Sequence, residues 1–376
     1  MRCEGKRSDL LPALVAAARV APVRAVRPVL SAALLEARGD AELVVRATDL
    51  ERTLEFAAPA GVVERGKVAV PARLLAEAVR AAPDGPLSLW GDGAELRVVW
   101  PGGRLALRGY EPSEMPAWPE WPGGGVRLRR DAFAAFVSGT AFAAARDSGK
   151  PISGVWLELG ESGVVGVATD GYRMALGWLG EVEEGGGEAR RALVPAAGLE
   201  EAARVVGDGD GECEVAASGS RFAVRAGDVM LTARMLDGLY PDVRSAVPRE
   251  SESVVLVGRD EFVGALERMA LVVAEDGLHP VRVVWSGGEV MLRAENGDVG
   301  EGEERMAAST DGPSGEVVLN ARHLLDCVKN LGGPEVAVGV SGQVVRVWSP
   351  SSAASGEGSL SDLVRFEYYL TSMRAE

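Results

Sequence analysis

Cysteine and histidine are scarce in this chain of 376 residues. It contains three cysteines, Cys3, Cys213 and Cys327, and two histidines, His279 and His323. Cysteines so few and so far apart predict neither a disulfide framework nor a zinc site, and free thiols suit a reducing cytoplasm. We therefore expect no metal, no cofactor and no catalysis that depends on histidine.

Positive charge is also in deficit. Fifty-five acidic residues outnumber 40 lysines and arginines, and the formal net charge is -15. A balance of this sign argues against a simple basic nucleic-acid-binding protein.

Long apolar segments are missing as well. The longest uncharged run with a helical pattern, residues 132–145, is shorter than the ~20 residues that span a bilayer. The basic and apolar start of the chain resembles a short signal peptide. However, Glu4 and Asp9 interrupt it, and the same stretch recurs at Asp131 and Asp260. We expect neither a membrane segment nor a cleaved signal.

Motifs of common enzymes are absent too. No glycine-rich loop ends in Lys-Ser or Lys-Thr, and no dinucleotide-binding fingerprint follows a strand. Residues 208–212 are acidic and glycine-rich, but the ligand pattern of a calcium loop is incomplete and a β-turn is the better interpretation. His323 and Cys327 can share one helix face without a third partner. We expect no active site.

The chain does have a threefold repeat. The clearest segment, Val70–Arg80, returns as Val194–Arg204 and Leu319–Lys329, at offsets of 124 and 125 residues. Two further series keep the same order: Asp9, Asp131 and Asp260 open the units, and inside them recur Ala47-Thr48-Asp49, Ala168-Thr169-Asp170 and Ala294-Glu295-Asn296. This period exceeds the ~20–50 residues of a solenoid repeat, so it predicts three copies of a whole domain.

Each unit predicts two helices among many short strands. Phe133, Phe136 and Val137 fall at helical spacing, and β-branched residues mark strands at 42–47, 155–159 and 281–285. The pattern indicates an α+β fold with antiparallel sheets. Joints rich in proline and glycine at residues 112–125 and 241–252 divide the chain into domains 1–122, 123–250 and 251–376.

The repeated helix carries a basic residue at the same place in every unit: Arg80, Arg204 and Lys329. Arg73 and Arg322 lie seven residues before two of them and so share their helix face. One interpretation is an ordinary solvated face. The other is a set of helices that present cations to one polyanion, through phosphate contacts that are independent of sequence and sensitive to salt.

Over nearly its full length the chain resembles the bacterial DNA polymerase III beta subunit family, the replicative sliding clamps. The resemblance rests on residues 47–51, 70–73, 168–175 and 237–242 and on Met373-Arg374. It implies three similar domains, each with two helices packed on antiparallel sheets, that form half of a closed ring. Two chains would join head to tail around duplex DNA, slide without sequence specificity and tether the replicative polymerase. Such a ring is a processivity factor of DNA replication, not an enzyme, and a separate clamp loader opens it.

The resemblance also implies three groups of site residues. DNA-binding residues would be Arg24, Arg73, Arg80, Arg146, Lys150, Arg204, Arg322 and Lys329. The dimer interface would set Leu105 and Leu107 against Leu271 and Val272 of the other protomer. An apolar cleft for short peptide motifs of the polymerase and clamp-loader subunits would be lined by Ile152, Thr169, Gly171, Tyr172, Arg173, Met174, Pro241, Ala246, Val247, His323, Val344, Leu370, Met373 and Arg374.

The chain departs from the family near its C-terminus. Ser372 replaces a usual proline, Thr371 precedes it, Ala375 and Glu376 follow the motif, and the loop at 349–362 looks longer than usual. A specialised clamp paralogue with altered partners is therefore one alternative. Another is a repeat-built interaction scaffold that does not enclose DNA. A third, an enzyme that uses Asp49 and Asp170, is less favoured because these residues recur as repeat landmarks in turn-like settings.

Overall fold

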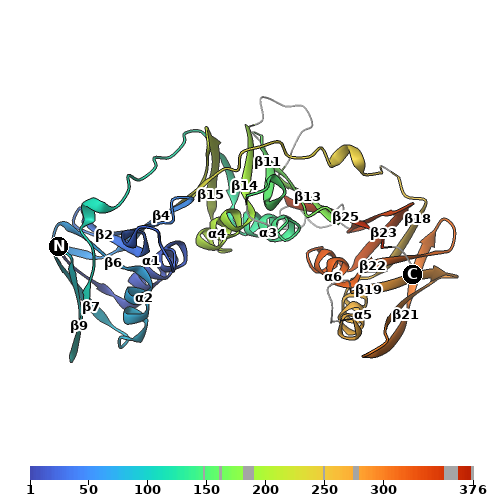
Figure 1. Ribbon diagram of the computed structural model, residues 1–376, viewed down its shortest axis with the longest axis horizontal. Coiled ribbons are helices and arrows are strands. Elements are labelled where there is room, and N and C mark those ends of the chain that lie inside the picture. Colours follow the sequence, from blue (N-terminus) through green and yellow to red (C-terminus); the bar gives the residue numbers. More distant parts are fainter. Residues whose placement is uncertain are drawn as a thin grey trace. The chain divides into compact units, whose positions relative to one another are not determined.

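The computed structural model describes residues 1–146, 149–160, 163–180, 190–248, 250–273, 279–350 and 363–373. Six α-helices and 25 strands occur in these residues, and Figure 1 labels most of them. Arg374 and residues 351–362 of the long loop lie outside the described residues.

The first repeat contains eleven elements: β1 (Arg2–Lys6), α1 (Arg7–Val20), β2 (Ala32–Arg38), β3 (Glu42–Thr48), β4 (Arg52–Pro59), β5 (Gly61–Glu64), β6 (Gly66–Pro71), α2 (Ala72–Ala81), β7 (Pro86–Asp92), β8 (Glu95–Trp100) and β9 (Gly103–Arg108).

The second repeat follows the same order: β10 (Val126–Arg129), α3 (Arg130–Ala141), β11 (Gly154–Leu159), β12 (Gly163–Thr169), β13 (Arg173–Gly180), β14 (Arg190–Pro195), α4 (Ala196–Val206), β15 (Glu212–Ser218), β16 (Arg221–Ala226) and β17 (Val229–Arg234).

The third repeat does so again: β18 (Ser253–Gly258), α5 (Arg259–Val272), β19 (Pro280–Ser286), β20 (Glu289–Asn296), β21 (Gly300–Asp311), β22 (Gly315–Asn320), α6 (Ala321–Lys329), β23 (Glu335–Ser341), β24 (Val344–Trp348) and β25 (Val364–Thr371). Three α+β modules with two helices each are thus confirmed, and β5 is an addition in the first module.

The strands form three sheets. Their orders are β5-β1-β7-β8-β9, then β10-β15-β16-β17-β4-β3-β2-β6, then β14-β11-β12-β13-β25-β24-β23-β18-β21-β20-β19-β22. Two antiparallel pairs, β4 with β17 and β13 with β25, join strands of successive repeats. The pairing of successive repeats is therefore itself a repeated feature.

Two compact units result from this pairing. One comprises residues 1–130, 201–207 and 211–235, and the other comprises residues 131–200, 208–210 and 236–376. The units cut across the predicted domains because the sheets continue from one repeat into the next. The domain bounds 1–122, 123–250 and 251–376 stay a prediction.

The helices are amphipathic and cover the sheets with their apolar faces. In α2, Leu75, Ala76 and Val79 are buried, whereas Arg73 and Arg80 are exposed. In α6, the side chain of Asn320 accepts a hydrogen bond from the backbone N–H of His323 and caps the helix. The spacing of apolar and charged residues along a helix such as α2 determines which side chains face the solvent.

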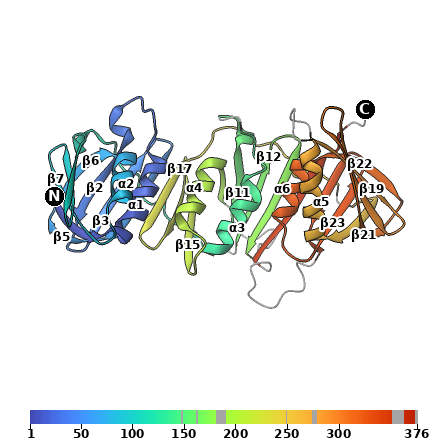
Figure 2. The same cartoon turned by 90° about the horizontal axis from the view of Figure 1, so that it is seen from below.

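Neighbouring helices pack side by side within each unit. Helix α1 packs on α2, and α5 packs on α6, as Figure 2 shows from below. The hydroxyl of Ser138 on α3 donates to Asn330 Oδ1, at the end of α6, over 3.4 Å. In the part of the chain that the structure describes, no helix is long and apolar enough to cross a membrane.

Candidate functional site

The eight basic residues predicted to contact DNA are all exposed: Arg24, Arg73, Arg80, Arg146, Lys150, Arg204, Arg322 and Lys329. Five lie on the helices named by the repeat, two on α2, one on α4 and two on α6. Arg24 follows α1, and Arg146 and Lys150 follow α3. Exposure suits a contact with phosphate, although it does not test that role.

Two of these cations have acidic neighbours. Arg204 donates to Glu201 Oε2 over 2.6 Å, and the Nζ of Lys329 lies 2.7 Å from Glu267 Oε1. Glu201 is 4% exposed and also accepts a 2.8 Å bond from Arg19 on α1. Such ion pairs restrict the conformation of the basic side chain.

Four other predicted DNA-binding residues differ from Arg204 and Lys329 in this respect. Within the described ranges, Arg24, Arg73, Arg80 and Arg322 form no side-chain ion pair. Their full charge is therefore available to an external anion. The sequence did not separate these residues from Arg204 and Lys329. Glu201 recurs as Glu77 and Asp326 in the other repeats, where, in the described part of the chain, neither pairs with the basic residue three positions later, and Glu267 lies outside the repeated segment.

The turn between β12 and β13 carries Gly171 and Tyr172, two of the predicted cleft residues. Asp170 Oδ1 accepts bonds from the backbone N–H groups of Tyr172 at 2.9 Å and Arg173 at 3.0 Å. The hydroxyl of Thr169 donates to the carbonyl of Arg173 over 2.7 Å. Gly171 takes a positive φ of 95°, which suits glycine. The turn leaves Tyr172 71% exposed.

The turn between β3 and β4 repeats these bonds. Asp49 Oδ1 accepts from the backbone N–H groups of Glu51 and Arg52, and the hydroxyl of Thr48 donates to the carbonyl of Arg52 over 2.7 Å. Both aspartates thus serve as turn caps whose oxygens are occupied. Their geometry explains why they recur and gives no support to a catalytic role.

Arg173 lies behind the turn. Its guanidinium donates to Asp170 Oδ2 at 3.0 Å, to Asp326 Oδ2 on α6 at 2.7 Å and to the carbonyl of Phe142 at 3.0 Å. The side chain is 11% exposed. Arg173 therefore ties the turn to helix α6, and its predicted contact with a peptide stays a prediction.

An apolar floor lies on the other face of the same strands. Met174 clusters with Val167 and Tyr369, and Val247 and Val344 pack against that cluster. Leu370 pairs with Arg173 and, by the alternation of a strand, faces away from this floor. Met174, Val247 and Val344 are the predicted cleft residues that the structure brings together here.

The remaining cleft residues lie on other segments of the chain. Pro241 and Ala246 are exposed on the segment that follows β17, and Ile152 and Met373 are half-buried. The backbone N–H of Met373 donates to the carbonyl of Val318 over 2.8 Å, which fixes the chain after β25.

His323 is half-buried at the start of α6. Burial and the nearby charge of Arg173 lower the pKa of His323 below its usual value. The imidazole is therefore neutral at physiological pH. A neutral ring can line an apolar cleft at a lower desolvation cost than a charged one.

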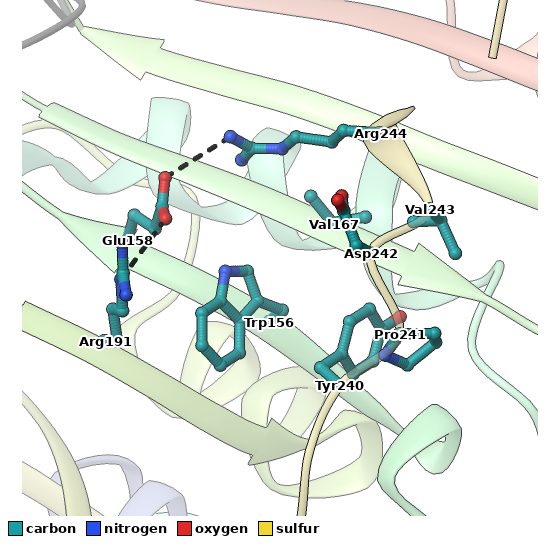
Figure 3. A pocket seen from close by; sticks show the side chains of 9 residues that line it. All are labelled: Trp156, Glu158, Val167, Arg191, Tyr240, Pro241, Asp242, Val243 and Arg244. Atoms are coloured by element: carbon teal, nitrogen blue, oxygen red, sulfur yellow. Dashed lines mark hydrogen bonds and ion pairs between the residues drawn. The ribbon is translucent and has the colours of Figure 1, made fainter. Parts of the chain in front are cut away.

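A pocket of about 260 Å³ lies beside the cleft (Figure 3). It is lined by Trp156, Glu158, Val167, Arg191, Tyr240, Pro241, Asp242, Val243 and Arg244. Sequence reasoning found only Pro241 of this set. The others come from β11, β12, β14 and the segment after β17, and no local pattern joins them.

The predicted dimer residues lie on β9 and at the end of α5. Leu105 is 39% exposed and Leu271 is 73% exposed. Val272 is half-buried, and Leu107 is 4% exposed because it packs in its own sheet.

No group of three acidic, histidine or cysteine side chains is placed to hold a metal ion in the ranges described.

Family models match the chain in three consecutive parts. Residues 1–119 match the N-terminal domain of the DNA polymerase III beta subunit, residues 127–242 its central domain and residues 244–350 its C-terminal domain. Together these matches cover most of the chain.

Individual proteins agree with this result. The beta sliding clamp of Streptomyces coelicolor is 31% identical over 344 residues, which cover 89% of each chain. The beta sliding clamp homolog GriR of Streptomyces muensis is 31% identical over 333 residues, which cover 88% of each chain.

Solved structures share the fold. The DNA polymerase III subunit beta of Pseudomonas aeruginosa superposes with a TM-score of 0.88 at 26% identity and covers 100% of both chains. The DNA polymerase sliding clamp of Bacillus subtilis gives a TM-score of 0.90 at 19% identity with the same coverage. Matches over most of the chain in sequence and over its whole length in fold favour a clamp over an unrelated repeat scaffold. The chain belongs to the DNA polymerase III beta subunit family, the beta sliding clamps, which are non-catalytic processivity factors of DNA replication.

Proposed function

We propose that two copies of this chain join head to tail into a ring that encircles duplex DNA and slides along it. The ring holds the replicative polymerase through the apolar cleft, and clamp-loader subunits use the same cleft. Each protomer contributes three domains, 1–122, 123–250 and 251–376. The observation that carries the proposal is a joint between successive repeats, in which a strand of one repeat pairs with a strand of the next. This joint occurs twice in the described residues, and the strands that would form a third copy are left without each other.

This joint is a pair of strands from successive repeats. The third strand after the first helix of one repeat pairs with the last strand of the next repeat. In this way β4 pairs with β17, and β13 pairs with β25. The corresponding strands left over are β21 and β9. Within the described residues, β9 pairs with β8 alone, and residues 300–307 of β21 pair with β20 alone. Exposed edges of this kind invite another strand. Pairing β21 of one protomer with β9 of its partner closes the ring with two identical joints.

The register of the internal joint predicts the contacts of this interface. In the pair of β4 with β17, Arg52 lies opposite Ala233 and Glu55 lies opposite Met230. If the strands of the dimer are aligned by their first residues, Arg104 faces the partner's Glu303 and Leu105 faces the partner's Gly302.

Charge and packing support this register. Arg104 and Glu303 are exposed and opposite in charge. A Cβ atom added at Gly302 would lie 3.0 Å from Met269 Cε and 3.5 Å from Val272 Cγ2, so Met269 and Val272 both cover Gly302. Leu105 would therefore meet the partner's Val272, and Leu271 lies beside it on the same helix end. These are the apolar contacts that the sequence predicted.

The DNA contacts of the ring are proposed to come from the eight exposed basic residues. Enclosure retains DNA without strong contacts, so a few cations suffice and sliding stays free. The acidic remainder of the chain repels DNA from other surfaces. We place the protein in the cytoplasm, where its three buried and unpaired cysteines remain reduced.

Retention on circular DNA tests enclosure directly. The protein is loaded by a clamp loader onto nicked circular DNA, and bound protein is separated by gel filtration before and after linearisation. We expect the protein to stay on the circle and to leave the linear form. Equal retention on both forms would refute the ring and favour a scaffold that binds DNA at one side.

A further inference from the structure

We infer that the pocket beside the cleft is a second anchoring point for the same partner peptides, and that it takes an apolar side chain next to a carboxylate. The occupant is a segment of the partner peptide that flanks the part bound in the cleft. It supplies one apolar residue and an acidic residue next to it. This inference rests on the proposed function, because it adds a contact to the peptide that the cleft holds.

The apolar part of the pocket is formed by two aromatic rings. Trp156 and Tyr240 stack with ring centroids 6.2 Å apart and an interplanar angle of 19°. Val167 and Val243 complete this side. A volume of about 260 Å³ is below the ~300–1,000 Å³ of small-molecule sites, so the pocket suits one side chain and not a whole ligand.

The polar part displays two guanidinium groups. Arg191 and Arg244 lie 3.5 and 3.3 Å from the two oxygens of Glu158, as Figure 3 shows. Both distances exceed the ~2.7–2.9 Å of a strong charge-assisted hydrogen bond. One carboxylate is thus shared by two cations, and each guanidinium retains unused N–H donors.

Exposure indicates which charge an incoming group meets. The side chain of Arg191 is 67% exposed and that of Arg244 is 41% exposed, whereas Glu158 is 25% exposed. Asp242, the other acid of the pocket, is also exposed and accepts a bond from the backbone N–H of Ser245 over 3.4 Å. The two exposed guanidinium groups are the donors that complement a carboxylate.

The pocket continues the cleft. Val167 at its base belongs to the same apolar cluster as Met174, and Tyr240 and Val243 pack against that cluster. Pro241 lines the pocket and is a predicted cleft residue. A peptide anchored at Met174 therefore needs only a short extension to reach the pocket.

The test measures peptide binding to the full-length protein by fluorescence anisotropy. One labelled peptide carries Leu-Phe as its apolar anchor. Two others add Phe-Asp at the N-terminal or the C-terminal side, and matched peptides add Phe-Asn. We expect one Phe-Asp extension to tighten binding about tenfold, and Phe-Asn to give a smaller gain.

Two protein variants locate the gain. Arg191→Glu combined with Arg244→Glu should remove the benefit of Phe-Asp and leave the affinity for the unextended peptide unchanged. The matched control is Arg365→Glu, because Arg365 lies over Trp178 of the same apolar cluster but outside the pocket. It should retain the gain. Unfolding temperatures of the double variant and the control are measured alongside, so that a lost benefit of Phe-Asp is distinguished from a loss of fold.

The outcomes separate the two proposals. If the unextended peptide binds and Met174→Asp abolishes its binding, but neither extension adds affinity, the pocket is not a second anchor. A gain that survives in the double variant would also overturn it. If the unextended peptide does not bind the wild-type protein, the cleft itself fails, and the second anchor fails with it.

Discussion

At the scale of single residues, the turn that carries Gly171 and Tyr172 depends on one largely buried cation. Arg173 holds the turn at the cleft by three hydrogen bonds from one side chain, to Asp170, Asp326 and Phe142. Removing one partner of a buried ion pair lowers the free energy of unfolding far more than removing one partner of an exposed pair, because the remaining group stays buried and unpaired.

Replacing Arg173 should therefore reduce both stability and peptide binding. Arg173→Ala leaves Asp326 and the carbonyl of Phe142 without this donor, and we expect a loss of roughly 3 kcal/mol in the free energy of unfolding. The matched control is Arg52→Ala in the first module, where Arg52 pairs with Asp49 of its own turn and is 28% exposed. Urea denaturation should show a smaller loss there, and equal losses would contradict the tie to α6.

His323 should make stability depend on pH. Since burial and Arg173 lower the pKa of the folded protein's His323, the folded state binds this proton less well than the unfolded chain. The contribution is fully present above the unfolded pKa of ~6.5 and is lost as the pH falls toward the lower folded pKa.

His323→Gln lacks this titration. Thermal unfolding between about pH 7.5 and about pH 5.5 should show the wild type losing stability relative to the variant as the pH falls. A constant difference in unfolding temperature across this range would show that burial does not disfavour the charged form.

At the scale of elements, the proposed assembly depends on the strand pairing between repeats. The edges of β9 and β21 carry Arg104 and Glu303, which the register of the β4–β17 pair would set opposite each other across the proposed dimer. Exchange of these charges is the sharpest test of that register.

Arg104→Glu should weaken the dimer roughly tenfold, because it faces two acidic side chains toward each other. Glu303→Arg in the same chain should restore most of the affinity. Arg97→Glu on β8 is the matched control, since β8 has strands on both sides. Analytical ultracentrifugation over a dilution series measures all four proteins, and failure of the double variant to recover would reject the register.

Helix cations without acidic neighbours should dominate the DNA contact. Arg73→Glu with Arg322→Glu should reduce retention on circular DNA at moderate salt more than Arg204→Glu with Lys329→Glu, because Glu201 and Glu267 already neutralise part of the second pair. Dimerisation should be unaffected in both. Equal effects of the two pairs would argue against this distinction.

Local patterns in the sequence were sufficient to predict some of the elements. The strands expected at 42–47, 155–159 and 281–285 match β3, β11 and β19 within two residues. The two helices per repeat were also predicted, because the spacing of apolar residues determines each buried face. Sheet order could not be predicted in this way. The pairing of β4 with β17 joins residues far apart, and Thr53 and Thr232 at that joint carry no local sign of it.

The site could be predicted only in part for the same reason. Met174, Val247 and Val344, which the structure brings together, were named through a resemblance of motifs, and their role stays a prediction. Trp156, Arg191 and Arg244 of the proposed second anchor were not named, because each is an ordinary residue of a strand or linker until the fold brings it to the others.

At the scale of the whole molecule, the proposed assembly follows from three copies of one module and one repeated strand pairing. Each copy pairs with the next. In the proposed ring, β9 and β21 of two chains would pair with each other, and a cyclic dimer would leave neither of these edges open.

The most direct measurement is small-angle X-ray scattering on a sample whose mass is determined by multi-angle light scattering. The account predicts a particle of twice the mass of the chain, with a distance distribution that requires a central hole wide enough for duplex DNA, about 20 Å or more in diameter. A monomer at micromolar concentration, or a dimer with a filled centre, would contradict it.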